Sequence, residues 1–222
     1  MPSTCLAVFD LDGTLIDSRR DLADSANAML ADYGARPLGE DQIASMVGSG
    51  AATLVKRVIT AAGVNASLDE ALSRFLSAYD ARLTHHTRPY DGIPALLDEL
   101  EASDMAMAVL TNKPVEQSVR ILDAFDLSKH FQWVIGGDGP WPRKPAPDGM
   151  KFLMQKAEAN ADETVLVGDS SVDLQTSRNA GVTICLARYG FGFADLSTGE
   201  LRGDESFVDI PAEISGVLRA SR

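Results

Sequence analysis

The chain has 222 residues, of which 45% are hydrophobic and 23% are charged, and its net charge is −12. This composition is ordinary for a soluble globular protein, and the acidity argues against the basic face that nucleic-acid binding requires. No apolar stretch is long enough to span a bilayer, and residues 1–4 lack the basic region of a signal peptide, so we expect a cytoplasmic protein without nucleic-acid or membrane partners.

The first predicted element is a buried strand at residues 5–9, where a short apolar run ends at turn residues. Two carboxylates, Asp10 and Asp12, follow this strand directly. In open α/β sheets, ligands bind in the crevice beyond the carboxyl ends of the strands. Two acids at that position predict a site that holds a cation and leaves one acid free for nucleophilic or acid–base chemistry.

The pattern then becomes helical, with glycines at positions that stop helices. Helices are predicted at residues 18–30, 40–47, 51–62 and 68–83. No strand pattern is visible between about residues 16 and 83. We therefore expect an all-helical insertion placed directly after the first strand.

From about residue 90 onward, strands alternate with helices. Strands are predicted at residues 106–110, 133–135, 164–167, 182–186 and 206–208, and helices at residues 93–100, 115–125, 149–158, 174–180 and 211–218. This alternation predicts an α/β fold with a doubly wound parallel sheet. Right-handed crossovers bring the carboxyl ends of such strands to one edge. We expect the polar residues near these ends to converge: Asp10, Asp12, Thr111, Asn112, Lys144, Asp169 and Asp173.

This set of residues has the chemistry of a phosphoryl site. Carboxylates that face one crevice repel one another and raise one another's pKa, which a hard cation relieves. Oxygen ligands without histidine or cysteine suit Mg²⁺. Lys144, in a loop stiffened by prolines, adds a positive charge, and Thr111 and Asn112 can donate hydrogen bonds to an anion. One carboxylate can then attack phosphorus while another protonates the leaving oxygen.

Four motifs carry a resemblance to a known family. Asp10-Leu11-Asp12-Gly13-Thr14, Thr111-Asn112-Lys113, Lys144-Pro145 and Gly168-Asp169-Ser170-Ser171-Val172-Asp173 resemble the ordered motifs of the haloacid dehalogenase-like hydrolase superfamily. The resemblance covers nearly the whole chain. It implies a Rossmann-like core at residues 1–15 and 88–222, with a mobile helical cap domain at residues 16–87 inserted after the first strand.

The resemblance also implies a role for each motif residue. Asp10 would be the nucleophile, and Asp12 the general acid and then the general base. Mg²⁺ would be bound by Asp10, the Asp12 carbonyl and Asp169, with Asp173 as a further ligand, a supporting residue or a structural anchor. The phosphoryl group would be bound by these residues: Thr14, Thr111, Asn112 and Lys144.

Finer matches resemble the phosphoglycolate phosphatases. They are Thr111-Asn112-Lys113-Pro114, the run at residues 136–148, Val47-Gly48-Ser49-Gly50 and Tyr189-Gly190. They imply hydrolysis of a small phosphate monoester, 2-phosphoglycolate, with substrate contacts from these residues: Gly48, Ser49, Gly50 and Arg20. Gly48 and Gly50 fit a helix stop equally well. Trp141 and the pair Arg19 and Arg20 depart from the branch pattern at positions that could touch a substrate.

Other functions remain open at this point. A phosphosugar mutase similar to beta-phosphoglucomutase would use the same scaffold, with a sugar oxygen in place of water, and a non-catalytic binding protein is a more distant alternative. Metal-free dehalogenase chemistry fits less well, because Asp12, Asp169 and Lys144 form a metal-and-phosphate set. We expect a monomer or homodimer in which Cys5 and Cys185 are buried thiols, since both lie in apolar runs.

Overall fold

A six-stranded sheet forms the centre of the computed structural model, which describes residues 6–220 apart from the side chain of Asp195. Its strand order is β5–β4–β1–β6–β7–β8, and all neighbours are parallel. The strands are β1 (Leu6–Phe9), β4 (Ala106–Leu110), β5 (Trp133–Ile135), β6 (Thr164–Gly168), β7 (Thr183–Ala187) and β8 (Ser206–Val208). The predicted doubly wound α/β fold is confirmed.

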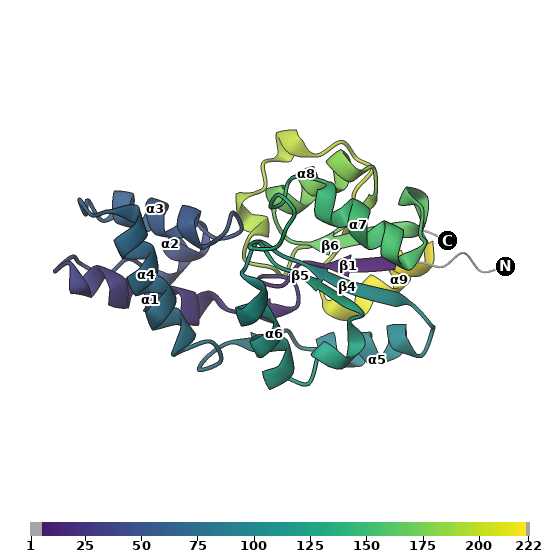
Figure 1. Cartoon of the computed structure of the whole chain (residues 1–222). Helices are drawn as coiled ribbons and strands as arrows, with labels where there is room; N and C mark the ends of the chain where they lie inside the picture. Colours follow the sequence, from purple (N-terminus) through teal and green to yellow (C-terminus); the bar gives the residue numbers. More distant parts are fainter. Residues whose placement is uncertain (1–5, 221–222) are drawn as a thin grey trace.

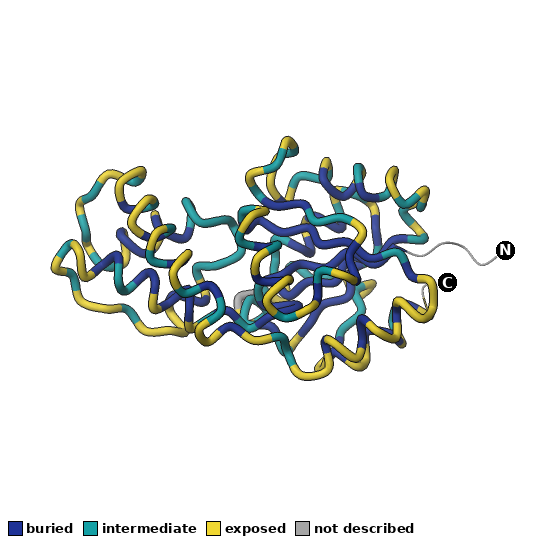
Figure 2. The backbone as a smooth tube through the Cα atoms, turned by 60° about the horizontal axis from the view of Figure 1, so that its bottom comes forward, coloured by how far each residue is buried: buried dark blue, intermediate teal, exposed yellow. Residues whose placement is uncertain are grey.

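Helices cover both faces of this sheet (Figure 1). Because successive side chains of a strand point to opposite faces, Phe9 and Val109 belong to one hydrophobic core, and Val8 and Leu110 to the other. The first core is completed by α5 (Ile93–Glu101), α6 (Val115–Ala124) and α9 (Ile214–Ala220), and the second by α7 (Asp148–Ala157) and α8 (Ser171–Ala180). Figure 2 shows the central strands buried, whereas exposed and buried residues alternate along the helices.

The helical insertion lies beyond the carboxyl ends of the strands, on the left in Figure 1. It consists of α1 (Arg19–Asp32), α2 (Glu40–Ala44), α3 (Ala51–Ala61) and α4 (Leu68–Asp80). Its apolar faces are continuous with the first core of the sheet, through residues such as Leu22, Leu54 and Phe75. We call these four helices and their loops the cap.

A short ribbon joins the cap to the sheet domain, at a point where no strand was expected. β2 (Ile16–Asp17) pairs antiparallel with β3 (Arg88–Pro89). Each strand has only two residues, and its partner lies far away in the sequence, so local periodicity could not reveal it. The chain therefore enters and leaves the cap side by side.

Most predicted elements are present, and the differences concern their ends. The expected helices at 40–47 and 68–83 stop earlier, at Ala44 and Asp80. α8 begins earlier than expected, because Ser170 and Asp173 form a capping box. The short 3₁₀ helices are η1 (Ser128–His130), η2 (Ala161–Glu163), η3 (Phe193–Asp195), η4 (Thr198–Glu200) and η5 (Pro211–Glu213).

The expectations about the cysteines and about membrane-spanning segments can be compared with the structure of residues 6–220. Cys185 is buried and forms no disulfide there, as expected. Cys5 and residues 1–4, on which the other thiol and the absence of a signal peptide depend, lie outside the described residues. Between residues 6 and 220, no helix is both long enough and apolar enough to cross a membrane.

Candidate active site

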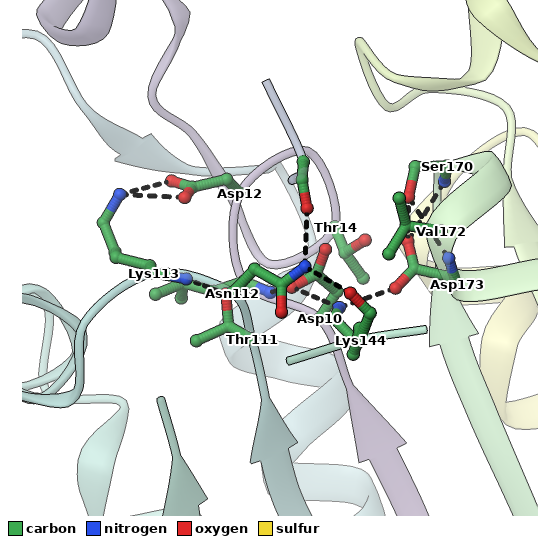
Figure 3. Close-up of polar contacts among 12 residues, drawn as sticks. Asp10, Asp12, Thr14, Thr111, Asn112, Lys113, Lys144, Ser170, Val172 and Asp173 are labelled. Carbon is green, nitrogen blue, oxygen red and sulfur yellow. Dashed lines mark hydrogen bonds and ion pairs between the residues drawn. The ribbon is translucent and has the colours of Figure 1, made fainter. Parts of the chain in front are cut away.

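The carboxyl ends of β1, β4 and β6 bring the motif residues together beneath the cap (Figure 3). Asp10 follows β1, Thr111 follows β4, and Asp169 follows β6. Asp10, Asp169 and Asp173 are all buried, and each offers a carboxylate oxygen within 4.8 Å of the others. The predicted convergence of these acids is therefore present in the structure.

Lys144 is the cation at the centre of this acidic cluster. Its Nζ lies 2.9 Å from Oδ1 of Asp10 and 2.6 Å from Oδ1 of Asp173. Burial tends to lower the pKa of Lys144, but the two carboxylates outweigh this effect and raise it. The ammonium is thus held charged between two acids.

One lysine does not neutralise three buried carboxylates. Burial raises the pKa of Asp10 to about 6, against the opposing effect of Lys144. Burial raises the pKa of Asp169 well above its usual range, and the nearby Asp173 and Asp10 raise it further. A cluster that resists full ionisation by itself, and that presents only oxygen donors, fits a hard divalent cation.

Asp169 is held in place by a close approach of glycine backbone. The Gly192 N–H donates to its Oδ2 at 2.7 Å, and the Thr14 hydroxyl donates to its Oδ1 at 3.3 Å. A Cβ added to Gly13, whose φ is +86°, would lie 2.0 Å from Oδ2 of Asp169. Thr14, expected at the phosphate, therefore faces Asp169, and only glycine fits at position 13.

Asp173 uses both of its oxygens inside the protein. Oδ1 pairs with Lys144, while Oδ2 accepts hydrogen bonds from the Ser170 N–H and hydroxyl at 3.1 and 2.6 Å. Among the three roles open for this residue, this geometry is that of an anchor, which joins Lys144 to the start of α8.

The Asp10 carboxylate is oriented by its surroundings. Its Oδ1 accepts from the Leu11 N–H at 2.7 Å and also contacts Lys144. Within residues 6–220 no hydrogen bond holds Oδ2. One oxygen is thus fixed, and the other can react or bind a cation.

The Asp12 carboxylate points away from this cluster, toward the cap. The Ser18 hydroxyl donates to its Oδ1 at 2.6 Å, and Lys113 Nζ lies 3.0 and 2.8 Å from its two oxygens. Ser18 is the N-cap residue of α1, but its side chain makes no capping hydrogen bond and donates to Asp12 instead. Asp10 and Asp12 therefore face different partners.

Lys113 is the residue of this site to which the sequence assigned no role. Its side chain is 4% exposed, and its Nζ lies 4.6 Å from the ring centroid of Tyr79 on α4. A lysine that follows a strand is usually solvated. Its place in the motif Thr111-Asn112-Lys113 was the one feature of the sequence that could have indicated a role for it in the site. Its burial follows from the closeness of α4 and Asp12, which only the fold provides.

A partly open chamber lies between the cap and the strand ends. It offers about 50 Å³ of free volume. Its polar lining comes mainly from the sheet domain, with Asp10, Asp12, Thr111, Asn112, Lys113 and Gln117, and the cap contributes mostly apolar residues: Leu22, Val47, Gly48, Gly50, Ala51, Leu54, Phe75, Leu76 and Tyr79. Gly48 and Gly50 thus reach the chamber, whereas Ser49 is not part of its lining.

Asn112 connects the cap loop to the lysine loop. Its Nδ2 donates to the carbonyls of Gly48 and Lys144, each at 2.9 Å (Figure 3). The amide group expected to bind an anion is therefore engaged with two backbone carbonyls. Thr111 is buried beside it, and its hydroxyl accepts from the Lys113 N–H at 3.2 Å.

Three residues singled out in the sequence lie away from the chamber. Arg20 is exposed on α1, where its guanidinium lies 3.9 Å from Asp24. Arg19 pairs with Asp17 at 2.6 Å beside the ribbon. Trp141 packs on Phe152, with 4.2 Å between ring centroids. None of the three belongs to the chamber lining among the described residues.

Comparisons with known proteins agree with this geometry. Residues 7–187 match the haloacid dehalogenase-like hydrolases as a family. The chain belongs to the haloacid dehalogenase-like hydrolase family. Its relatives include a phosphoglycolate phosphatase of Pseudomonas syringae pv. tomato, 37% identical over 191 residues that cover 84% of this chain and 70% of the relative. That of Agrobacterium fabrum is 34% identical over 214 residues, which cover 95% of this chain and 91% of the relative.

A solved structure supports the same placement. A crystal structure described as a predicted phosphoglycolate phosphatase from Haemophilus somnus superposes with a TM-score of 0.90 at 28% identity, and covers 98% of this chain and 99% of its own. This member of the haloacid dehalogenase-like family therefore lies in the phosphoglycolate phosphatase-like branch, and it is a phosphatase.

Proposed function

We propose that this phosphatase hydrolyses 2-phosphoglycolate with Mg²⁺, through a phosphoryl group carried covalently on Asp10. The observation that carries the proposal is the buried cluster of Asp10, Asp169 and Asp173 around Lys144, which borders the chamber under the cap at Asp10. The relatives named phosphoglycolate phosphatases support the same substrate.

The donors of the cluster fit Mg²⁺. Three buried carboxylates face one ammonium, and burial raises the pKa values of Asp10 and Asp169, which the neighbouring Asp173 raises further. We assign Asp10, the Asp12 carbonyl and Asp169 as residues that would hold the ion, with Asp173 beside them. Mg²⁺, when bound, would neutralise phosphoryl oxygens and favour attack by an anionic carboxylate.

In the first half of the reaction, the Asp10 carboxylate attacks phosphorus and the bond from phosphorus to the leaving oxygen breaks. Asp12 gives a proton to that oxygen, which leaves as the hydroxyl of glycolate. Lys144 and Thr111 bind the transferring group, for which their burial next to Asp10 is suitable.

In the second half, Asp12 removes a proton from a water molecule, which attacks the same phosphorus atom. The bond between Asp10 and phosphorus breaks, and inorganic phosphate leaves with the carboxylate restored. The different partners of the two acids support this division of roles, since Asp10 is fixed by Leu11 and Lys144 while Asp12 points into the chamber.

We further propose that the cap, residues 16–87, opens and closes over the core, residues 1–15 and 88–222. A closed cap excludes water from the acyl phosphate, and an open one releases products. The phosphosugar mutase alternative would use the same site residues, so the reaction product distinguishes it from hydrolysis.

The remaining expectations also stay proposals. We propose that the enzyme works in the cytoplasm, which the buried free thiol of Cys185 supports. We propose that it acts as a monomer or homodimer on a small phosphorylated substrate, without a nucleic-acid partner, and its net charge of −12 supports the last point.

The test is phosphate release from 2-phosphoglycolate by the purified protein. Release should require Mg²⁺, stop with a chelator, and be abolished in Asp10→Asn. Asp24→Asn is the matched control, because Asp24 is exposed on α1 and contacts only Arg20, at 3.9 Å, among the ion pairs of residues 6–220. Full activity of Asp10→Asn would exclude Asp10 as the nucleophile. An isomerised sugar phosphate formed without phosphate release would favour the mutase.

A further inference from the structure

The chamber has a single positive charge in its wall. Among the described residues that line it, Asp10, Asp12 and Lys113 are the charged ones, and Lys113 alone is cationic. Lys144, the other buried lysine of the site, is engaged by Asp10 and Asp173. A leaving group that enters the chamber therefore meets one ammonium, that of Lys113.

The surroundings of Lys113 favour contact with an anion. Its Nζ lies 4.6 Å from the centroid of the Tyr79 ring, and the cap also lines the chamber with apolar residues, Leu54, Phe75 and Leu76 among them. In such a wall the ammonium is poorly solvated, and its present counter-charge is Asp12. A second anion could therefore bind next to the Lys113 ammonium and would displace little water from it.

Two residues of the chamber lining carry a buried polar atom without a hydrogen-bond partner. The Tyr79 hydroxyl and Gln117 Oε1 are buried and make no hydrogen bond within residues 6–220. Buried polar groups without partners cost free energy, which a polar ligand recovers. Burial raises the pKa of Tyr79 to about 12, so this hydroxyl stays protonated and can donate to a carboxylate.

We propose that Lys113 is a specificity-determining residue, which selects phosphate esters whose leaving group carries a carboxylate close to the ester oxygen. The Lys113 ammonium and the Tyr79 hydroxyl would bind that carboxylate next to the apolar cap wall. This inference rests on the proposed function and explains how the site would distinguish glycolate from a neutral alcohol of the same size.

The experiment compares 2-phosphoglycolate with its carboxamide, glycolamide 2-phosphate, which has the same shape and no carboxylate charge. For the wild-type enzyme, kcat/KM should be higher for the acid by about 10- to 100-fold, the range expected for a hydrogen bond to a charged group. In Lys113→Met this preference should disappear, because only the acid loses its ionic partner, whereas the loss of the Lys113–Asp12 pair affects both substrates alike. Lys113→Arg should retain part of it.

A matched control is Lys129→Met, because Lys129 is an exposed lysine that pairs with Asp126 far from the chamber. It should keep the wild-type preference. Inhibition of the wild-type enzyme by glycolate and by glycolamide gives a second measurement that needs no variant, and glycolate should bind more tightly.

Two results would overturn the inference while leaving the proposed phosphatase intact. One is equal kcat/KM of the wild-type enzyme for acid and amide. The other is an equal loss of activity on both substrates in Lys113→Met, which would show that Lys113 only positions Asp12. Absence of phosphate release from either substrate by the wild-type enzyme would instead overturn the proposed function itself.

Discussion

The Lys144 ammonium lies 2.6 Å from Oδ1 of Asp173, and both side chains are buried. Asp173 also fixes the first turn of α8 through Ser170. Lys144 is therefore tied to the first turn of α8, the helix between β6 and β7, and this pairing sets its position relative to Asp10.

Replacing Asp173 with alanine should lower both stability and activity. The variant removes one of the two carboxylates that pair with Lys144 and the acceptor of both Ser170 hydrogen bonds, and a hydrogen bond to a charged group contributes about 1.5–3 kcal/mol to the free energy of unfolding. Urea unfolding measures this loss, and phosphate release should fall in parallel. Ser170→Ala removes the hydroxyl bond to Asp173 but leaves Lys144 paired, so it should have the smaller effect on activity. A loss below about 1 kcal/mol for Asp173→Ala would contradict the importance of the pair.

Gly13→Ala should abolish the response to Mg²⁺. The added methyl would have to lie 2.0 Å from Oδ2 of Asp169, so the proposed metal ligand must move. Gly34→Ala is the control, because Gly34 also has a positive φ, +66°, but its Cβ would meet nothing within 4 Å. Both variants should lose about 1–3 kcal/mol from backbone strain, yet only Gly34→Ala should retain thermal stabilisation by Mg²⁺. An unchanged Mg²⁺ effect in Gly13→Ala would argue against Asp169 as a ligand.

The stabilisation by Mg²⁺ should grow with pH. The pKa of Asp10 is raised from 3.8 to about 6, so folding without metal favours the protonated acid, and stability from this group declines as pH rises from about 4 through 6. A cation needs the ionised carboxylate, so protons compete with it below pH 6. The Mg²⁺-induced rise in melting temperature should be larger at pH 7.5 than at pH 5.5. An equal rise at both values would contradict this coupling.

Asn112→Ala should weaken substrate use by loosening two loops at once. Both the Gly48 and Lys144 carbonyls lose their donor, and two hydrogen bonds of about 1 kcal/mol each correspond to roughly a tenfold or larger fall in kcat/KM. Asn179→Ala provides the comparison, because Asn179 also donates to the lysine loop, to the Pro145 carbonyl at 2.8 Å, but is exposed. Equal effects of the two variants on kcat/KM would indicate a general loop defect rather than a role of the cap contact.

The sheet and its acidic edge could be predicted because local patterns determine them. Each apolar run is short, and each ends in polar residues, so strand ends and topology together place Asp10 and Asp169 in one crevice. The helical pattern also argues against the substrate contact that the resemblance implied for Arg20. Leu22, Ala26 and Met29 occupy the buried face of α1, and this leaves Arg20 outside.

The polar contacts around Asp12 could not be predicted, because they join segments far apart in sequence. Lys113 is buried only because α4 places Tyr79 against it. Ser18 has the sequence context of a helix cap, and its choice of Asp12 instead depends on how the chain turns after β1. The unexpected ribbon between Ile16–Asp17 and Arg88–Pro89 has the same long-range origin.

This ribbon also restricts how the cap can travel. Its two strands are paired with each other, the Tyr90 N–H donates to the Leu15 carbonyl, and buried Asp21 binds the backbone of His86 and Thr87. The two segments that connect the cap to the sheet domain are thus bonded to each other and cannot move independently. We expect the cap to rotate as a rigid body about a single axis, so that Gly48 and Tyr79 separate from Asn112 and Lys113 in one concerted step.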